Sequence, residues 1–157
     1  MNHIRYHSPI GLLTLVEENN ALIAVSFDTE EPADIGQACE TPVLKEASKQ
    51  LDEYFSGSRT VFTLPLRMQG TEFQNSVWNA LQTIPYGKTL TYGDIAKQIK
   101  RANAQRAVGN ANNKNPIPII VPCHRVIGAS GNLVGYGGGL DKKQYLLDLE
   151  QSNRKSE

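Results

Sequence analysis

The chain has 157 residues, of which 39% are hydrophobic, enough for one ordinary domain or two small ones around a packed core. The sequence begins without a long apolar segment behind a basic head, and no apolar run approaches the roughly 18 residues of a membrane span, so we expect a cytoplasmic protein that does not enter membranes. The net charge of zero hides a division: residues 1–72 hold 11 acids and 5 Lys+Arg, whereas residues 73–157 hold 5 acids and 11 Lys+Arg. This asymmetry indicates a polyanionic partner for the C-terminal half.

The N-terminal part predicts a small α/β scaffold lobe over residues 1–70. Alternating apolar residues separated by turn-forming segments predict strands over residues 3–8, 11–18 and 21–28. A helix is expected to begin at Pro42 and to end at Gly57, and a further short strand is expected over residues 61–66. None of these segments carries an obvious chemistry.

The C-terminal part, residues 71–157, predicts a mostly helical domain. Thr71 with Gln74 and Thr91 with Asp94 both have the spacing of a capping box, so helices are expected to begin there. The second of these helices, over residues 92–100, is followed by a turn and a third helix over residues 104–113, a pattern that resembles a helix-turn-helix. Paired short helices are common in protein cores, so the basic charge around them strengthens the interpretation.

The third helix has an unusual surface for a protein that binds DNA. It is rich in Ala and Gly, and Arg106 is the one long charged side chain in its middle. Helices that read bases in the major groove usually carry several Asn, Gln, Arg or Lys. Small residues instead allow the backbone to approach a groove closely, with the arginine free to enter the duplex. The alternative is that the alanines pack against a neighbouring helix and Arg106 is solvated.

Cys123 and Cys39 are the two cysteines, and they lie in different settings. Cys39 is in an acidic loop and is interpreted as an inert thiol. Cys123 follows the apolar segment PIIV, which predicts a buried strand that presents the thiol at its end, beside His124 and Arg125. Neighbouring side chains on a strand point to opposite faces, so a Cys–His pair requires the chain to turn at Cys123. A third group must orient the imidazole; Glu150 is the candidate, and surface solvation is its alternative role.

Metal binding has little support from the sequence. There is no CxxC pair or HxxxH spacing, and Cys123 with His124 would need two further ligands. We therefore expect no metal and no cofactor.

The segments PCHRVIG, RAVGNANNKNP and GNLVGYGGGLDKKQYLLDLE together closely resemble the O6-alkylguanine-DNA alkyltransferase family, over a region from about Phe73 to Glu150. The N-terminal part resembles the RNase-H-like lobe of that family in strand pattern and size. The resemblance implies an α/β fold in which this lobe is followed by a mostly helical domain with a helix-turn-helix and the active-site cysteine segment.

The resemblance also assigns roles to individual residues. It implies that Cys123 is the alkyl acceptor, that His124 acts as a base through a bound water, and that Glu150 orients His124. Tyr92 would assist base flipping and donate to guanine N3, and Arg106 would fill the space that the flipped nucleotide leaves. The other residues expected to line the base pocket, contact DNA or hold the recognition helix are Ala107, Lys114, Asn115, Arg125, Val126, Tyr136, Gly137 and Gly138.

The activity that the resemblance implies is DNA repair by direct reversal. A methyl or other alkyl group of O6-alkylguanine in double-stranded DNA would pass irreversibly to the Cys123 thiolate of a monomeric protein, after the base is flipped through the minor groove. O4-alkylthymine is the alternative substrate. The thioether product is a poor leaving group, so each molecule would act once.

Three other functions compete with this one. A cysteine hydrolase or acyltransferase would also use Cys, His and an acid, but it leaves the basic region and Arg106 unexplained. A module that binds damaged bases without reacting would not need Cys123. A DNA-binding regulator would need side chains that read bases.

Overall fold

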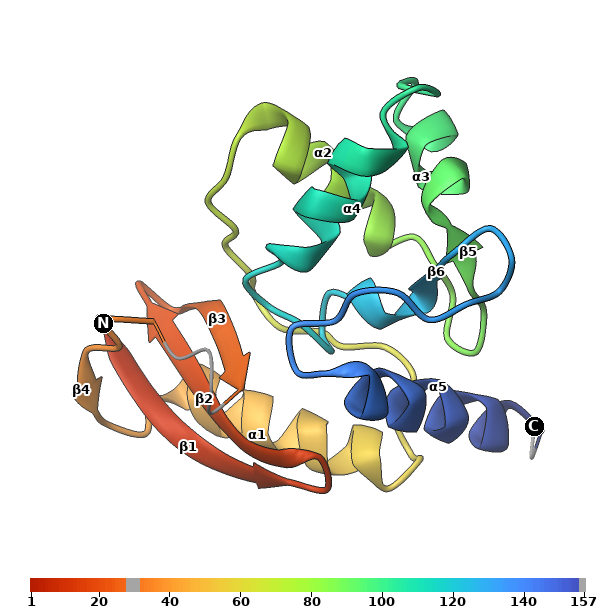
Figure 1. The fold of residues 1–157 in the computed structure, drawn as a ribbon. Coiled ribbons are helices and arrows are strands. Elements are labelled where there is room, and N and C mark those ends of the chain that lie inside the picture. The colour runs from red at the N-terminus through yellow and green to blue at the C-terminus, as the bar shows by residue number, and fades with distance from the viewer. Residues whose placement is uncertain (28–31, 156–157) are drawn as a thin grey trace. The chain divides into compact units, whose positions relative to one another are not determined.

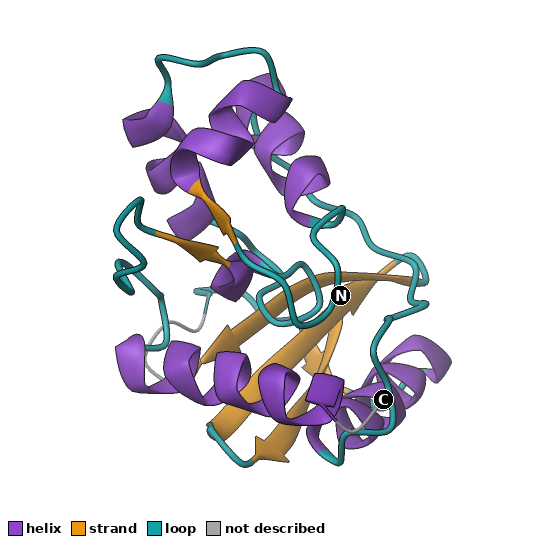
Figure 2. Ribbon diagram, turned by 90° about the vertical axis from the view of Figure 1, so that its right-hand side faces the viewer, coloured by secondary structure: helices purple, strands orange, loops and turns teal. Residues whose placement is uncertain are grey.

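The computed structural model describes residues 1–27 and 32–155 and divides into two units, Met1–Met68 and Gln69–Glu157. The N-terminal unit contains a sheet and a helix, and the C-terminal unit is mostly helical (Figure 2). The predicted fold class, an α/β lobe followed by a mostly helical domain, is confirmed.

The N-terminal unit is a four-stranded sheet in the order β3-β2-β1-β4, with helix α1 packed on it (Figure 1). β1 pairs antiparallel with β2, β2 pairs antiparallel with β3, and β4 pairs parallel with β1. The elements are β1 (Asn2–Ser8), β2 (Gly11–Glu18), β3 (Ala21–Phe27), β4 (Gln37–Ala38) and α1 (Pro42–Phe55).

Helix α1 begins where the sequence predicts, since Thr41 caps the backbone N–H of Leu44 and Pro42 occupies the first turn. Its apolar side chains at three- and four-residue spacing give it one buried face, formed by Leu44, Ala47, Leu51 and Tyr54.

The strand expected over residues 61–66 is wrong. The segment makes a single bridge, between Leu66 and Leu22, flanked by bonds from Leu22 N–H to the Pro65 carbonyl and from Arg67 N–H to the Leu22 carbonyl. Pro65 has no N–H to donate, which limits a ladder at this position. The predicted end of the third strand, Asp28, lies outside the described residues.

The C-terminal unit packs helices α2, α3 and α4 together and adds a two-stranded parallel sheet and helix α5. Its elements are α2 (Glu72–Leu81), β5 (Leu90–Thr91), α3 (Tyr92–Gln98), α4 (Gln105–Asn113), β6 (Val126–Ile127) and α5 (Leu140–Lys155). The predicted capping boxes at Thr71 and Thr91 are both present and start α2 and α3. α3 and α4, joined by a short turn, form the helix-turn-helix. Trp78 on α2 ties the helices together, because its indole N–H donates to the Ala111 carbonyl at 2.8 Å.

One segment of the C-terminal unit differs from the prediction. Residues 118–121 are buried but are not a strand; Pro118 lacks an N–H group, and Ile119 has φ +74°. On α5, Leu146 and Lys143 are buried, whereas Leu140 is 47% exposed.

Within residues 1–27 and 32–155, no helix is both long and apolar enough to cross a membrane.

Candidate active site

The acceptor segment turns sharply at Cys123. Cys123 opens a short 3₁₀ helix, Cys123–Arg125, in which the Arg125 N–H donates to the Pro122 carbonyl at 3.0 Å. Before it, Ile119 adopts a left-handed conformation that is rare for a β-branched residue, so the segment holds local backbone strain. The turn that a Cys–His pair requires is therefore present, and it places a free, buried thiol in the C-terminal unit.

Two asparagines connect this segment to helix α4. Asn115 donates from Nδ2 to the Val121 carbonyl at 2.8 Å and accepts the Ile117 N–H at Oδ1 at 2.9 Å, which closes the loop after α4. Asn112, buried at the end of α4, donates to the Cys123 carbonyl at 3.4 Å. The third helix of the domain and the acceptor segment are thus bonded to each other through side chains.

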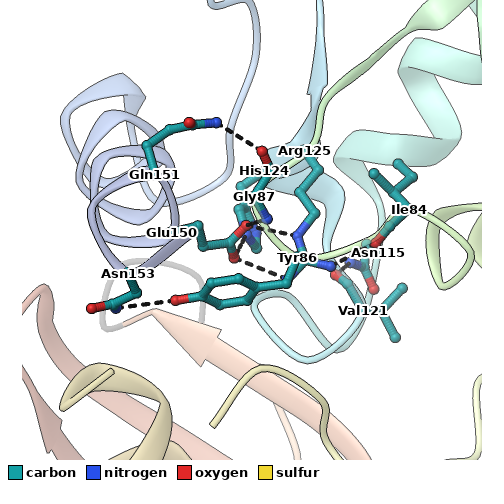
Figure 3. Close-up of polar contacts among 10 residues, drawn as sticks. All are labelled: Ile84, Tyr86, Gly87, Asn115, Val121, His124, Arg125, Glu150, Gln151 and Asn153. Carbon is teal, nitrogen blue, oxygen red and sulfur yellow. Dashed lines mark hydrogen bonds and ion pairs between the residues drawn. The ribbon is translucent and has the colours of Figure 1, made fainter. Parts of the chain in front are cut away.

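The residues that follow Cys123 form a buried ionic cluster with Glu150 (Figure 3). His124 Nε2 is 2.7 Å from Glu150 Oε2, with the two side chains 0% and 1% exposed. Because the carboxylate accepts, Nε2 carries the hydrogen, and the neutral ring keeps an acceptor lone pair on Nδ1. Nδ1 is buried and has no hydrogen-bond partner among the described residues.

Arg125 completes the cluster. Its Nε and Nη2 donate to the two Glu150 oxygens at 2.8 and 3.0 Å. Nη1 donates to the Ile84 carbonyl at 2.7 Å, and the guanidinium lies 5.6 Å from the centre of the Tyr86 ring. Arg125 is therefore buried and holds Glu150 in place, as Figure 3 shows.

Burial and charge set the protonation of these groups. Burial raises the pKa of Cys123 to about 11, although the Asn115 side chain and the Lys143 charge oppose the rise. Burial also lowers the pKa of His124, so its ring is neutral at pH 7. For Glu150, burial favours the neutral acid, but His124 and Arg125 outweigh it and lower the pKa to about 2. The resting site therefore holds a thiol, a neutral imidazole and a carboxylate.

Tyr92 and Lys143 share a hydrogen-bond acceptor and both interact with Cys123 electrostatically. The Tyr92 hydroxyl donates to the Val134 carbonyl at 2.8 Å, and burial followed by the nearby Cys123 charge raises the pKa of the phenol. Lys143, from the first turn of α5, donates to the carbonyls of Val134 at 3.0 Å and Gly135 at 3.3 Å. Its ammonium opposes the rise in the pKa of Cys123, so both side chains lie within electrostatic range of the acceptor.

The remaining predicted residues divide between surface and interior. Arg106, Ala107, Lys114 and Gly137 are exposed, Tyr136 and Gly138 are partly buried, and Val126 is fully buried in β6. Ala107 and Lys114 line a surface pocket of ≈ 190 Å³ between α4 and the start of α2. The Val126 side chain packs in the core.

Lys143 and Asn112 were missed by the sequence interpretation. For Lys143 a signal was available: cations are unfavourable in the first turn of a helix, yet Lys142 and Lys143 both follow Gly139 there. Asn112 offered no such signal, because an asparagine near a helix end is ordinary.

A helix-turn-helix joined to a buried cysteine with an ion-paired histidine places the chain among proteins that combine nucleic-acid binding with cysteine chemistry. Residues 1–68 match the family model described as 6-O-methylguanine DNA methyltransferase, ribonuclease-like domain. Residues 72–152 match the model of the DNA binding domain of the same enzyme. The chain therefore belongs to the 6-O-methylguanine DNA methyltransferase family, a family of DNA repair alkyltransferases.

Individual relatives agree along nearly the whole chain. The methylated-DNA--protein-cysteine methyltransferase of Mycobacterium leprae is 53% identical over 146 residues, covering 92% of this chain and 88% of the relative. The protein of that name from Methanosarcina acetivorans is 51% identical, covering 97% and 99%. Among solved structures, Mycobacterium tuberculosis OGT in complex with DNA superposes with a TM-score of 0.92 at 48% identity, covering 98% and 94%.

Proposed function

We propose that this protein repairs O6-alkylguanine in double-stranded DNA by moving the alkyl group to Sγ of its own Cys123, once per molecule. The observation that carries the proposal is the buried Cys123 thiol next to a histidine whose Nε2 is held at 2.7 Å by a buried carboxylate. This arrangement lies in a unit that also presents a helix-turn-helix. The relatives' shared name, methylated-DNA--protein-cysteine methyltransferase, supports the same activity.

The thiol must first lose its proton. With a pKa of about 11, Cys123 is protonated at neutral pH, so a base has to act as the substrate binds. His124 is that base: Nδ1 takes the proton through a water molecule, and the imidazolium that forms is stabilised by ionised Glu150 at Nε2. Arg125 keeps the carboxylate ionised and fixed.

The thiolate then attacks the alkyl carbon bound to O6. The S–C bond forms as the C–O bond breaks, and the electron pair of the C–O bond leaves on the guanine. Tyr92 is protonated and adjoins the thiol, so it donates to guanine N3 while negative charge develops on the base. The proton that left the thiol returns to the purine, so the products are S-alkylcysteine and guanine. A thioether is a poor leaving group, which makes the transfer irreversible.

DNA binding is assigned to the surface around the helix-turn-helix. Five exposed cations surround it, with no acid between Asp94 and Asp141 to oppose them: Lys97, Lys100, Arg101, Arg106 and Lys114. Their contacts to phosphates provide sequence-independent affinity. A base within a duplex cannot reach Cys123, so it is flipped out at a cost of a few kcal/mol. Arg106, exposed on α4, fills the space that it leaves, and the small residue Ala107 lets α4 approach the groove.

The test is incubation with a duplex that contains one O6-methylguanine, followed by mass mapping of the cysteine peptides. We expect one added methyl group on Cys123 per molecule and unmodified guanine in the DNA. Cys123→Ala should abolish transfer and keep binding to the modified duplex, whereas Cys39→Ser, which removes the exposed thiol of the N-terminal unit, should react at the wild-type rate. Loss of the lesion while Cys123 stays unmodified would overturn the proposal.

A further inference from the structure

Lys143 is buried in a place that ordinarily excludes lysine. Its side chain is 0% exposed, and it lies in the first turn of α5, where the helix dipole opposes a positive charge. No carboxylate among residues 1–27 and 32–155 pairs with it, and its ammonium donates to the carbonyls of Val134 and Gly135. A buried cation with neutral partners lowers stability, so it indicates a role in the chemistry nearby.

The carbonyl of Val134 has two donors in this structure. The Tyr92 hydroxyl lies 2.8 Å from it and Lys143 Nζ lies 3.0 Å from it. A carbonyl oxygen has two lone pairs, so both bonds form together. While Tyr92 donates to Val134, its proton is not available to a purine. Tyr92 must therefore give up this bond before it can donate to guanine N3.

We propose that Lys143 is a positioning residue for alkyl transfer: it keeps the Val134 carbonyl hydrogen-bonded when Tyr92 turns from Val134 to the flipped purine. The inference rests on the proposed function, and it assigns a role to a residue that the proposed mechanism does not use. Without Lys143, release of Tyr92 would remove the second of the two side-chain bonds that hold the Val134 carbonyl, so residues 134–135 would no longer be fixed beside the reacting groups. With Lys143 in place, Tyr92 exchanges one acceptor for another while residues 134–135 stay fixed.

The neighbouring lysine provides an internal comparison. Lys142 donates to the Gly138 carbonyl at 3.0 Å, at the other end of the same glycine-rich loop, and it is half-buried. It does not share an acceptor with Tyr92. The two lysines thus hold the two ends of one loop, and Lys143 alone of this pair acts on a carbonyl that Tyr92 also uses. The Lys143 ammonium also favours the Cys123 thiolate, which agrees with its place beside the acceptor.

The experiment is a double-mutant cycle between Lys143→Met and Tyr92→Phe, measured as the single-turnover rate of methyl transfer from an O6-methylguanine duplex. Lys143→Met removes the donor and the charge at similar length. In the wild-type background we expect it to slow transfer about ten- to hundredfold, the effect of one charge-assisted hydrogen bond. In the Tyr92→Phe background, where no hydroxyl has to move, we expect a loss several times smaller. Equal losses in the two backgrounds would overturn the inference.

Three controls separate the possible outcomes. Lys142→Met removes a cation from the same helix turn and should slow transfer much less than Lys143→Met; an equal loss would mean that both lysines merely hold the loop. Alkylation of Cys123 by iodoacetamide at pH 8 depends on the thiolate but needs no proton from Tyr92, so Lys143→Met should slow it less than it slows methyl transfer. A parallel fall in the two rates would contradict the exchange. If Lys143→Met does not fold, Lys143→Gln, which keeps an N–H donor, replaces it in the cycle. Absence of transfer in the wild-type protein would instead contradict the proposed function itself.

Discussion

The two units bury polar side chains in different ways. In the N-terminal unit, Gln50 on α1 is buried among apolar residues, and its side-chain amide bonds to Thr63. Its Oε1 accepts the Thr63 N–H at 2.9 Å, and its Nε2 donates to Thr63 Oγ1 at 3.0 Å. These are neutral groups that fix a loop on a helix. Among the described residues, the N-terminal unit buries one charged side chain, Glu17, whereas the C-terminal unit buries three, Arg125, Lys143 and Glu150.

This difference in buried charge distinguishes the unit that acts as a scaffold from the unit that carries the chemistry. A neutral amide with all its bonds made adds specificity at little cost, whereas a buried ion pair is often no more stable than well-packed apolar residues. The stability of the fold therefore does not account for the buried charges around Cys123. They are accounted for by a thiol that must lose its proton when the substrate binds.

The largest expected effect comes from removing the carboxylate at the centre of the cluster. Glu150→Ala leaves buried Arg125 and His124 without their shared partner, so we expect the free energy of unfolding to fall by about 3–5 kcal/mol. Urea denaturation at pH 7 measures it. Glu150→Gln keeps the volume and part of the hydrogen bonding, so it should lose less stability. A loss under about 1 kcal/mol in Glu150→Ala, the range of a surface pair, would mean that the cluster is solvated.

The second expected effect is the loss of stability in acid. The folded protein lowers the pKa of Glu150 from 4.5 to about 2, so its contribution is present above the unfolded value and disappears as the pH falls from about 5 to about 2. The difference corresponds to about 3 kcal/mol. His124 acts in the same direction below its ordinary pKa of 6.5, because burial keeps the folded ring from taking a proton that the unfolded chain accepts.

Urea denaturation between pH 7 and pH 3 tests this dependence. Glu150→Gln carries no titrating group at this position, so its stability should fall less steeply between pH 5 and pH 3 than that of the wild type. Equal slopes in the two proteins would assign the acid sensitivity to other residues and contradict the low pKa of Glu150.

Local rules predicted most of the fold. Thr71 and Thr91 were identified as helix starts because a capping box involves residues only three positions apart, and the structure contains both boxes. The strand expected over residues 118–121 was wrong because burial and apolar character do not fix the backbone. There Pro118 and the left-handed Ile119 prevent a ladder, and the turn serves to present Cys123.

The contacts at the site could be predicted only where the resemblance pointed to them. His124 and Glu150 are 26 positions apart, and no local pattern predicts that their side chains lie 2.7 Å from each other. The ion pair of Arg125 with Glu150 and the shared acceptor of Lys143 and Tyr92 depend on how α5 packs against the acceptor segment. Such contacts are tertiary, and spacing along the chain does not encode them.

The smallest expected effect concerns a hydrogen bond in the N-terminal unit, where the Tyr6 hydroxyl donates to the Asp52 carboxylate at 2.7 Å. Tyr6→Phe removes this partly buried bond, so we expect a loss of about 1–2 kcal/mol at pH 7 and an unchanged rate of methyl transfer. Burial, and then the bond and charge of Asp52, raise the pKa of Tyr6 above its ordinary value of 10.0. A raised pKa contributes stability below the unfolded value, and this contribution disappears as the pH rises above 10.

The stability difference between wild type and Tyr6→Phe should therefore shrink above pH 10, as measured by urea denaturation from pH 8 to pH 11. Taking the difference cancels the Cys123 thiol, whose raised pKa of about 11 gives both proteins the same alkaline sensitivity. A difference that stays constant over this range would contradict the raised pKa of Tyr6. A slower methyl transfer in Tyr6→Phe would contradict the division itself, because it would give a scaffold bond of the N-terminal unit a part in the chemistry at Cys123.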